Sequence, residues 1–190
     1  MSLFHNFIFD GQEEGSDVID IANNHKPDTL SRVWNVNTTT HLNNADNVTR
    51  GRYHSDDTIN GMGGNDRLSG LSGDDLLRGQ AGDDQLNGDS GNDVLVGGAG
   101  DDRLNGGWGE DIARFSGRFD EYTLKTEGGR LLVTDTISGR DGRDSLKNIE
   151  ILEFKDGQAV FDAASNRYQL LIDNMAGRLD AGRNSIVPDL

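Results

Sequence analysis

The chain has 190 residues, no cysteine, and 33 acidic against 18 basic residues, which gives a formal net charge of −15 at pH 7. The lack of cysteine excludes a disulfide-stabilised scaffold, and the acidity argues against a nucleic-acid ligand. Only 33% of the residues are hydrophobic and 26 are glycine, so a conventional apolar core must be small and the negative charge must be neutralised for the chain to fold.

Residues 1–51 are predicted to form a β-rich lead-in or cap. The apolar residues within 4–9 indicate a strand, and residues 30–36 and 47–50 indicate further short strands. No apolar run approaches the length needed to cross a bilayer, so no membrane span is expected.

The sequence at 15–22 stands out within this lead-in. Gly15, Asp17 and Ile19 have the spacing Gly-x-Asp-x-apolar that recurs later in the chain. The segment is either an isolated half-turn of that later repeat, with Asp17 beside a metal ion, or an ordinary Gly-Ser loop before a strand.

Residues 52–114 are seven consecutive units of nine residues, and a period so regular predicts a repeat architecture. The sixth position of every unit is aspartate: Asp57, Asp66, Asp75, Asp84, Asp93, Asp102 and Asp111. Six units have glycine at the first and fourth positions: Gly61, Gly64, Gly70, Gly73, Gly79, Gly82, Gly88, Gly91, Gly97, Gly100, Gly106 and Gly109. The eighth position is apolar throughout: Ile59, Leu68, Leu77, Leu86, Leu95, Leu104 and Ala113.

Each unit is predicted to be a strand of two or three residues preceded by a glycine-rich turn, because glycine adopts backbone angles that a side chain would forbid. Nine residues are too few to return to the same place, so successive units should lie on opposite sides and eighteen residues should complete one coil. Coils stacked at the strand spacing of about 4.8 Å form an all-β fold, a parallel β-roll, with the eighth-position residues in a thin core. The aspartates should then form two columns, the first with Asp57, Asp75, Asp93 and Asp111 and the second with Asp66, Asp84 and Asp102.

These carboxylate columns predict metal binding. Two carboxylates about 4.8 Å apart repel by roughly 3–4 kcal/mol at an effective dielectric constant near 20, and a thin core cannot offset that repulsion along both columns. A divalent cation between stacked turns makes the interaction attractive. Calcium accepts about six to eight oxygen ligands in irregular geometry, whereas magnesium requires a tighter octahedron, and the scarcity of Cys and His disfavours zinc and copper. Calcium is therefore the expected ion.

The units resemble the RTX, or haemolysin-type, calcium-binding nonapeptide G-G-x-G-x-D-x-U-x, where U is a large apolar residue. They resemble in particular the C-terminal domain of serralysin-like proteases and the R-modules of alginate epimerases. The resemblance implies calcium between units eighteen residues apart, held by the sixth-position aspartates and by backbone carbonyls of the turn glycines. It implies about five ions, one for each of the pairs Asp57–Asp75, Asp75–Asp93, Asp93–Asp111, Asp66–Asp84 and Asp84–Asp102.

Two units depart from the pattern. The first carries Arg52 and Ser55 where the others have glycine, so its turn should be distorted and its site half-formed. The last carries Ala113 at the apolar position, so the roll is expected to end at residue 114 with Phe115 closing its open end.

Residues 115–162 are predicted to be a C-terminal β cap, which covers the open edge of the last coil. Segments 121–126 and 130–136 alternate around a Gly-Gly pair and predict a β-hairpin. Segment 139–147 matches the nonapeptide an eighth time but is detached from the array, so Asp144 is either a further calcium ligand or not a ligand. Residues 145–157 resemble the ending of many RTX domains.

Residues 163–190 are predicted to be a short helix and a tail. The apolar residues Tyr168, Leu171, Ile172, Met175 and Leu179 fall at helical spacing. The helix is expected to pack on the flank of the roll and also, as the family resemblance implies, to belong to an uncleaved C-terminal signal for type I secretion.

No catalytic constellation is found. The sequence GDSG at 88–91 resembles the surroundings of a serine nucleophile, but Ser90 occupies the free third position of the nonapeptide. The expected function is a non-enzymatic, monomeric calcium-binding module that folds outside the cell and supports type I secretion. The alternative is a module that binds an anionic polysaccharide through a basic stripe of Arg67, Arg78, Arg103 and Arg114.

Overall fold

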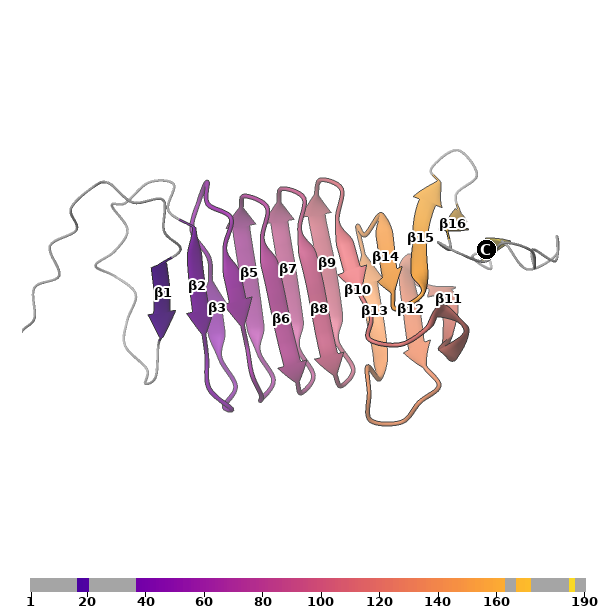
Figure 1. Cartoon of the computed structure of the whole chain (residues 1–190), viewed down its shortest axis with the longest axis horizontal. Helices are drawn as coiled ribbons and strands as arrows, with labels where there is room; N and C mark the ends of the chain where they lie inside the picture. The colour runs from indigo at the N-terminus through magenta and orange to yellow at the C-terminus, as the bar shows by residue number, and fades with distance from the viewer. Residues whose placement is uncertain (1–16, 21–36, 163–166, 172–184, 187–190) are drawn as a thin grey trace, which may run out of the picture.

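The computed structural model describes residues 17–20, 37–162, 167–171 and 185–186. The strands expected at 4–9 and 30–36, and most of the predicted C-terminal helix, lie outside these residues. Within them the fold is all-β, with two sheets that lie against each other along a long axis (Figure 1).

The first sheet has ten described strands, which lie in the following order. They are β1 (Asp17–Asp20), β2 (Thr38–His41), β4 (Thr58–Asn60), β6 (Leu76–Ala81), β8 (Val94–Ala99), β10 (Ile112–Arg114), β14 (Ile151–Phe154), β15 (Gly157–Asp162), β16 (Arg167–Leu171) and β17 (Ser185–Ile186). The second sheet has seven described strands. They are β11 (Tyr122–Glu127), β12 (Arg130–Asp135), β13 (Arg143–Lys147), β9 (Arg103–Trp108), β7 (Gln85–Ser90), β5 (Arg67–Ser72) and β3 (Val48–Arg50).

The repeat forms the expected coil of eighteen residues. Successive units alternate between the two sheets, and each strand pairs in parallel with the strand one coil away, as in the register Leu68 with Leu86 and Leu86 with Leu104. The prediction of an all-β parallel β-roll is confirmed.

The strands are longer than predicted. A full repeat strand such as β5 has six residues, from the seventh position of one unit to the third position of the next. It bends at Gly70 and Leu71, where Leu71 has φ +78°, and then pairs with β7 again at Leu71 and Ser72. The turn is therefore only three residues, Gly73 to Asp75, because the parallel ladder resumes beyond the first glycine.

The core is a single column of side chains between the sheets. Leu68, Leu77, Leu86, Leu95 and Leu104 are each at most 2% exposed. Fully burying such a side chain contributes about 1.5–3 kcal/mol, so each coil gains little apolar stabilisation for its eighteen residues.

The parallel stack continues beyond Arg114, the residue at which the sequence predicted the end of the roll. Strand β13 pairs in parallel with β9, and β14 pairs in parallel with β10. The predicted hairpin is present as β11 and β12, but it lies within an insertion between β10 and β13. The sequence hid this continuation because the insertion interrupts the nine-residue period.

An aromatic cluster closes the C-terminal end of the core. Phe115 is buried and stacks on Phe154 with ring centroids 5.3 Å apart, and Tyr122 lies 5.4 Å from Phe115. The 3₁₀ turn η1 (Phe119–Glu121) brings Phe119 edge-on to Phe154. Phe115 thus packs inside the cap and not over a bare last coil.

At the N-terminal end, strands β2 and β3 extend both sheets by one coil. Strand β1 adds to β2 in parallel, with Asp17 opposite Thr38 and Ile19 opposite Thr40. Because Thr40 is in turn opposite Ile59, the backbone at 17–20 follows the register of the nonapeptide.

The prediction of a C-terminal helix is wrong for residues 167–171. Residues 167–171, which include Tyr168 and Leu171, form the antiparallel strand β16 against β15. Pairing with an open sheet edge outweighs the helical spacing of the apolar residues. Ile172, Met175 and Leu179 lie outside the described residues.

Candidate metal sites

Each repeat turn buries one aspartate in the same arrangement, which Asp75 illustrates. Its Oδ1 accepts a hydrogen bond from the backbone N–H of Asp57, one coil earlier, at 2.7 Å. Its own N–H donates to Oδ1 of Asp93, one coil later, at 2.8 Å. Its Oδ2 is buried and has no hydrogen-bond partner among the described residues.

The arrangement repeats along both columns. The same N–H to Oδ1 bonds join Asp93 to Asp111, Asp66 to Asp84 and Asp84 to Asp102. Six aspartates within the described residues have a buried Oδ2 without a partner: Asp66, Asp75, Asp84, Asp93, Asp102 and Asp111. A buried carboxylate oxygen without a donor or a cation is costly. Six such oxygens in equivalent positions therefore indicate that each binds the same kind of ligand.

The first-position glycines lie against these oxygens. A Cβ atom on Gly70 would lie 2.1 Å from Oδ2 of Asp75 and 2.9 Å from the carbonyl oxygen of Gly88 in the next coil. The other predicted first-position glycines show the same contact with their own aspartate, at 2.0–2.4 Å: Gly61, Gly79, Gly88, Gly97 and Gly106. Only glycine leaves this space free between carboxylate and carbonyl.

The fourth-position glycines stack on one another. Gly91 has φ +132°, and a Cβ there would lie 1.9 Å from the carbonyl oxygen of Gly73, one coil earlier. The others also have φ between +97° and +144°: Gly64, Gly73, Gly82, Gly100 and Gly109. The turn carbonyls are thereby aligned along the same columns as the carboxylates.

Burial dominates the electrostatics of the columns. It raises the pKa of Asp75 and Asp102 to about 7, and that of Asp84 and Asp93 to about 6, and the neighbouring aspartates of each column raise these pKa values further. Backbone N–H donors to Oδ1 act in the opposite direction but are outweighed. The pKa values show that the folded chain alone does not provide a favourable environment for these negative charges.

The first unit differs from the others, as predicted. Gly51 takes the place of the first glycine, since a Cβ there would lie 2.5 Å from Oδ2 of Asp57, and it precedes its aspartate by one residue more than Gly70 does. Oδ2 of Asp57 accepts hydrogen bonds from the Arg52 N–H at 2.6 Å and from the Ser55 hydroxyl at 3.1 Å. The chain itself therefore satisfies this carboxylate.

The detached eighth match joins the second column. Asp144 is buried, and its Oδ1 accepts the N–H of Asp102 at 3.0 Å. A Cβ on Gly142 would lie 2.1 Å from the Gly100 carbonyl oxygen, as in the repeats. Burial raises the pKa of Asp144 to about 9.

Sequence reasoning missed Glu150. Its Oε2 accepts the N–H of Asp111 at 2.9 Å, so a glutamate occupies the next place in the first column. The signal was present, because Glu150 precedes the buried Leu152 by two residues, the spacing that separates sixth and eighth positions in the nonapeptide.

A second ladder at the fifth position was also missed. The Asp74 N–H donates to Oδ1 of Asp56 at 2.8 Å, and the Asn92 N–H donates to Oδ1 of Asp74 at 2.7 Å. Equivalent bonds run through Asp46, Asn65, Asp83 and Asp101. These side chains hold adjacent coils in register from the outside, and the run of Asp and Asn at this position was visible in the sequence.

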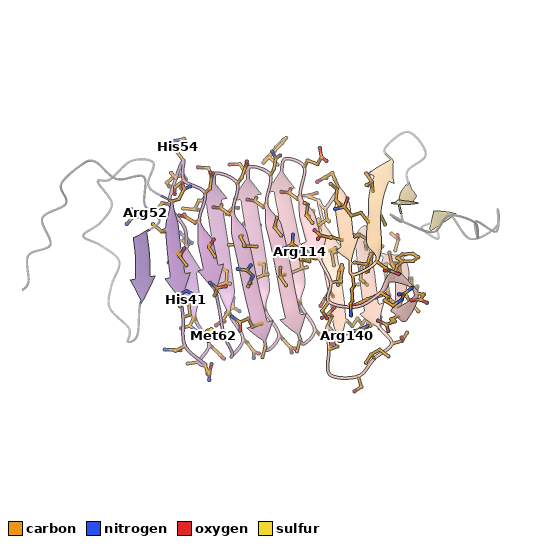
Figure 2. All side chains as sticks on the ribbon, viewed as in Figure 1. His41, Arg52, His54, Met62, Arg114 and Arg140 are labelled. Carbon is orange, nitrogen blue, oxygen red and sulfur yellow. The ribbon has the colours of Figure 1, made fainter. Side chains whose placement is uncertain are left out.

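The four arginines of the expected basic stripe do not form one stripe. Arg67 and Arg103 lie on the seven-stranded sheet, whereas Arg78 and Arg114 lie on the ten-stranded sheet. Arg114, near the middle of the molecule in Figure 2, forms an ion pair with Glu153 at 3.1 Å. Successive units alternate between sheets, which is why residues nine or eleven apart cannot share a face.

The seven-stranded sheet instead has a groove of about 370 Å³ on its surface. Its lining includes Arg50, Arg67, Arg103 and Arg130, with amide and hydroxyl side chains from Gln85, Asn87, Asn105 and Ser69. No acidic residue lines it, although the chain has a net charge of −15.

Ser90 is not arranged as a nucleophile, because its hydroxyl donates to the Leu71 carbonyl oxygen at 3.1 Å. In the described part of the chain, no three His, Asp or Glu side chains converge to hold a metal. A cation in the columns would therefore take most of its oxygens from backbone carbonyls.

The fold and its turns define a parallel β-solenoid that buries a carboxylate in every turn. Residues 55–86 and 78–113 match the profile of the RTX calcium-binding nonapeptide repeat, in its form of four copies. These residues thus match RTX nonapeptide repeats, a class of repeat that binds calcium.

A search of curated proteins gave no match to the chain. Among solved structures, the chain is similar to the extracellular lipase LipA from Serratia marcescens, with 17% sequence identity and a TM-score of 0.29. The likeness covers 82% of this chain and 20% of the lipase chain, so the present chain spans about a fifth of the lipase.

Among the described residues, no helix has the length and apolar character needed to cross a membrane.

Proposed function

We propose that this chain is a calcium-dependent folding module, in which calcium between stacked turns neutralises the carboxylate columns. The observation that carries the proposal is the set of six buried Oδ2 atoms without partners, each beside a first-position glycine. The donor set of carboxylates and backbone carbonyls is the one that calcium prefers.

The proposed ligands within the repeats are the sixth-position aspartates and the carbonyls of the turn glycines named above. The best-supported interfaces there are Asp66–Asp84, Asp75–Asp93, Asp84–Asp102 and Asp93–Asp111, because the first aspartate of each has an unpartnered Oδ2. The Asp57–Asp75 interface is the weakest candidate, since Arg52 and Ser55 already bind Oδ2 of Asp57.

Calcium supplies positive charge where the chain has none. The described ion pairs all involve residues between 114 and 156, so no basic side chain forms an ion pair with the columns. Because an ion that binds only the folded state stabilises it by mass action, the roll should be unfolded at the low calcium of a cytosol and folded at millimolar calcium.

This dependence suits a secreted protein that crosses a channel unfolded and folds outside the cell. We therefore propose an extracellular location, export by a type I system through a C-terminal signal, and a monomeric, non-catalytic role in the parent protein. The division into lead-in, roll, cap and tail at residues 51, 114 and 162 also stays a prediction, although the parallel sheets continue across the first two boundaries.

Circular dichroism of the full chain with calcium, with magnesium and with chelator tests the proposal. Calcium should produce the β-sheet signal and magnesium at equal concentration should not, because the turns lack a regular octahedral donor set. An equal β signal in all three conditions would contradict the proposal.

The groove on the seven-stranded sheet favours a second candidate function, the binding of an anionic polysaccharide. Arginine forms bidentate hydrogen bonds with carboxylates, and Arg67 and Arg103 lie two strands apart, or about 9.6 Å along the sheet. Short alginate oligomers titrated into the calcium-saturated chain should bind the wild type and an Arg78→Ala/Arg114→Ala control equally. They should bind an Arg67→Ala/Arg103→Ala variant at least about tenfold more weakly. Equal binding by the wild type, the control and this variant would exclude the groove as the binding site.

A further inference from the structure

The two ends of the carboxylate columns are built differently. At the N-terminal end the columns stop at neutral donors. The N–H and hydroxyl of Thr38 both donate to Oδ1 of Asp57, at 2.8 and 2.7 Å, and the N–H of Asn47 donates to Oδ1 of Asp66 at 2.7 Å. Neither Thr38 nor Asn47 carries a charge.

At the C-terminal end the columns stop at further carboxylates. Asp144 follows Asp102 in the second column, and Glu150 follows Asp111 in the first. Asp102 and Asp111 are at most 1% exposed, and the Oδ2 atom of each has no hydrogen-bond partner in the described part of the chain. The next coil therefore brings one more carboxylate to each of these aspartates.

We propose that Asp144 on β13 and Glu150, directly before β14, complete two further cation sites, one between Asp102 and Asp144 and one between Asp111 and Glu150, so that calcium fastens the cap to the roll. This inference rests on the proposed function, because it places the same ion in the same kind of turn. It adds Glu150 as a ligand and gives the cap its own dependence on calcium.

The oxygens at the Glu150 end match those inside the array. A Cβ on Gly88 would lie 2.1 Å from Oδ2 of Asp93 and 2.7 Å from the Gly106 carbonyl oxygen. A Cβ on Gly106 would lie 2.4 Å from Oδ2 of Asp111 and 2.1 Å from the Asn148 carbonyl oxygen. Asn148, with φ +51°, thus presents its carbonyl where a repeat presents that of a first-position glycine.

The two proposed sites span longer stretches of chain than those in the repeats. Asp102 and Asp144 are 42 residues apart, and Asp111 and Glu150 are 39 apart, against 18 for neighbours within the array. Closing a longer loop costs more conformational entropy, and here it also brings like charges together. The cap should therefore be the part of the structure that leaves the roll first when calcium falls.

The sharpest test is Glu150→Gln in the full chain, with Glu153→Gln as the matched control. Glu153 lies three residues later, on β14, but pairs with Arg114 outside the columns. Isothermal titration should give six calcium ions per chain for the wild type and the control, one for each unpartnered Oδ2, and one fewer for Glu150→Gln. Hydrogen exchange in calcium should show loss of protection in 143–154 and retained protection in 67–99 for Glu150→Gln alone.

An unchanged stoichiometry and unchanged protection in Glu150→Gln would overturn the inference while leaving calcium binding by the repeats intact. If Glu150→Gln does not fold at any calcium concentration, the wild-type stoichiometry decides: six ions support the two additional sites, and fewer than six contradict them. A wild type that binds no calcium would contradict the proposed function itself, which is a separate result.

Discussion

The roll and the cap are stabilised by different means. Between β5 and β9 the core is one leucine wide, and the buried carboxylates have no basic partner. In the cap, Phe115, Tyr122 and Phe154 pack together, and Arg140 forms ion pairs with Asp135 and Glu121 at 2.6 Å (Figure 2). A conventional core and paired charges stabilise the cap, whereas the roll depends on a cation that neutralises its carboxylate columns.

The largest expected effect is the difference in stability cost between a glycine substitution in the roll and one in the cap. Gly91→Ala should cost more than about 3 kcal/mol and prevent folding, because it combines a forbidden φ with an overlap against the Gly73 carbonyl. Gly128→Ala in the cap hairpin, with φ +58° and no atom within 4 Å, should cost only about 1 kcal/mol. Thermal unfolding in calcium measures both, and equal costs would show that the turns are not stacked as described.

The next effect concerns the thin core. Leu86→Ala should destabilise the calcium-bound chain by about 2–5 kcal/mol, because neighbouring coils cannot collapse into the cavity without breaking both ladders. Leu124→Ala in the cap removes a side chain that is only partly buried and should cost less. Denaturant unfolding in calcium checks the order, and a larger loss for Leu124→Ala would contradict it.

Removal of a single column carboxylate should have a smaller effect, on calcium binding. Asp93→Asn should weaken calcium binding at its own interfaces by on the order of tenfold, because calcium affinity follows the charge of the ligand set. Asp120→Asn, which removes an exposed cap carboxylate that contacts Arg118, should leave calcium binding unchanged. Calcium titrations of the two variants distinguish a column effect from a general loss of negative charge.

A substitution at Arg140 should instead lower the stability of the cap and leave calcium binding by the repeats unchanged. Its guanidinium contacts Asp135 and Glu121 and lies 5.1 Å from the centre of the Tyr122 ring. Arg140→Ala should destabilise the cap by about 1–3 kcal/mol through these lost contacts, without changing how many calcium ions the repeats bind. A reduced calcium stoichiometry would mean that roll and cap are less independent than their contacts indicate.

The smallest expected effect is one of pH in chelator. Burial raises the folded-state pKa of five column aspartates from 3.8 to about 6 or 7, so the calcium-free roll prefers them neutral: Asp75, Asp84, Asp93, Asp102 and Asp111. That contribution is fully present below about pH 4 and is lost as the pH rises through 6–7. Calcium-free chain should therefore show more β structure at pH 4.5 than at pH 8, and calcium binding should weaken on acidification. More β structure at pH 8 in chelator would contradict the assignment.

Much of this architecture could be predicted from the sequence, because the nine-residue period fixes strand, turn and coil at once. The register of Leu68, Leu86 and Leu104 follows from it directly. The period could not place Glu150 or Asp144 in the columns, since an insertion separates both from the array; only the two-residue spacing from Glu150 to Leu152 hinted at the first. Nor could it give strand length, which depends on the ladder resuming at Leu71, or the strand at 167–171, which forms against an available sheet edge.

The central claim is that the carboxylate columns close only around divalent cations. Amide hydrogen exchange of the wild-type chain, followed for the strands β5 to β9 at pH 7.5, tests it most directly. Protection of these strands in millimolar calcium, together with exchange at the rate of an unfolded chain in chelator, is the predicted result. Equal protection in both conditions would contradict the claim.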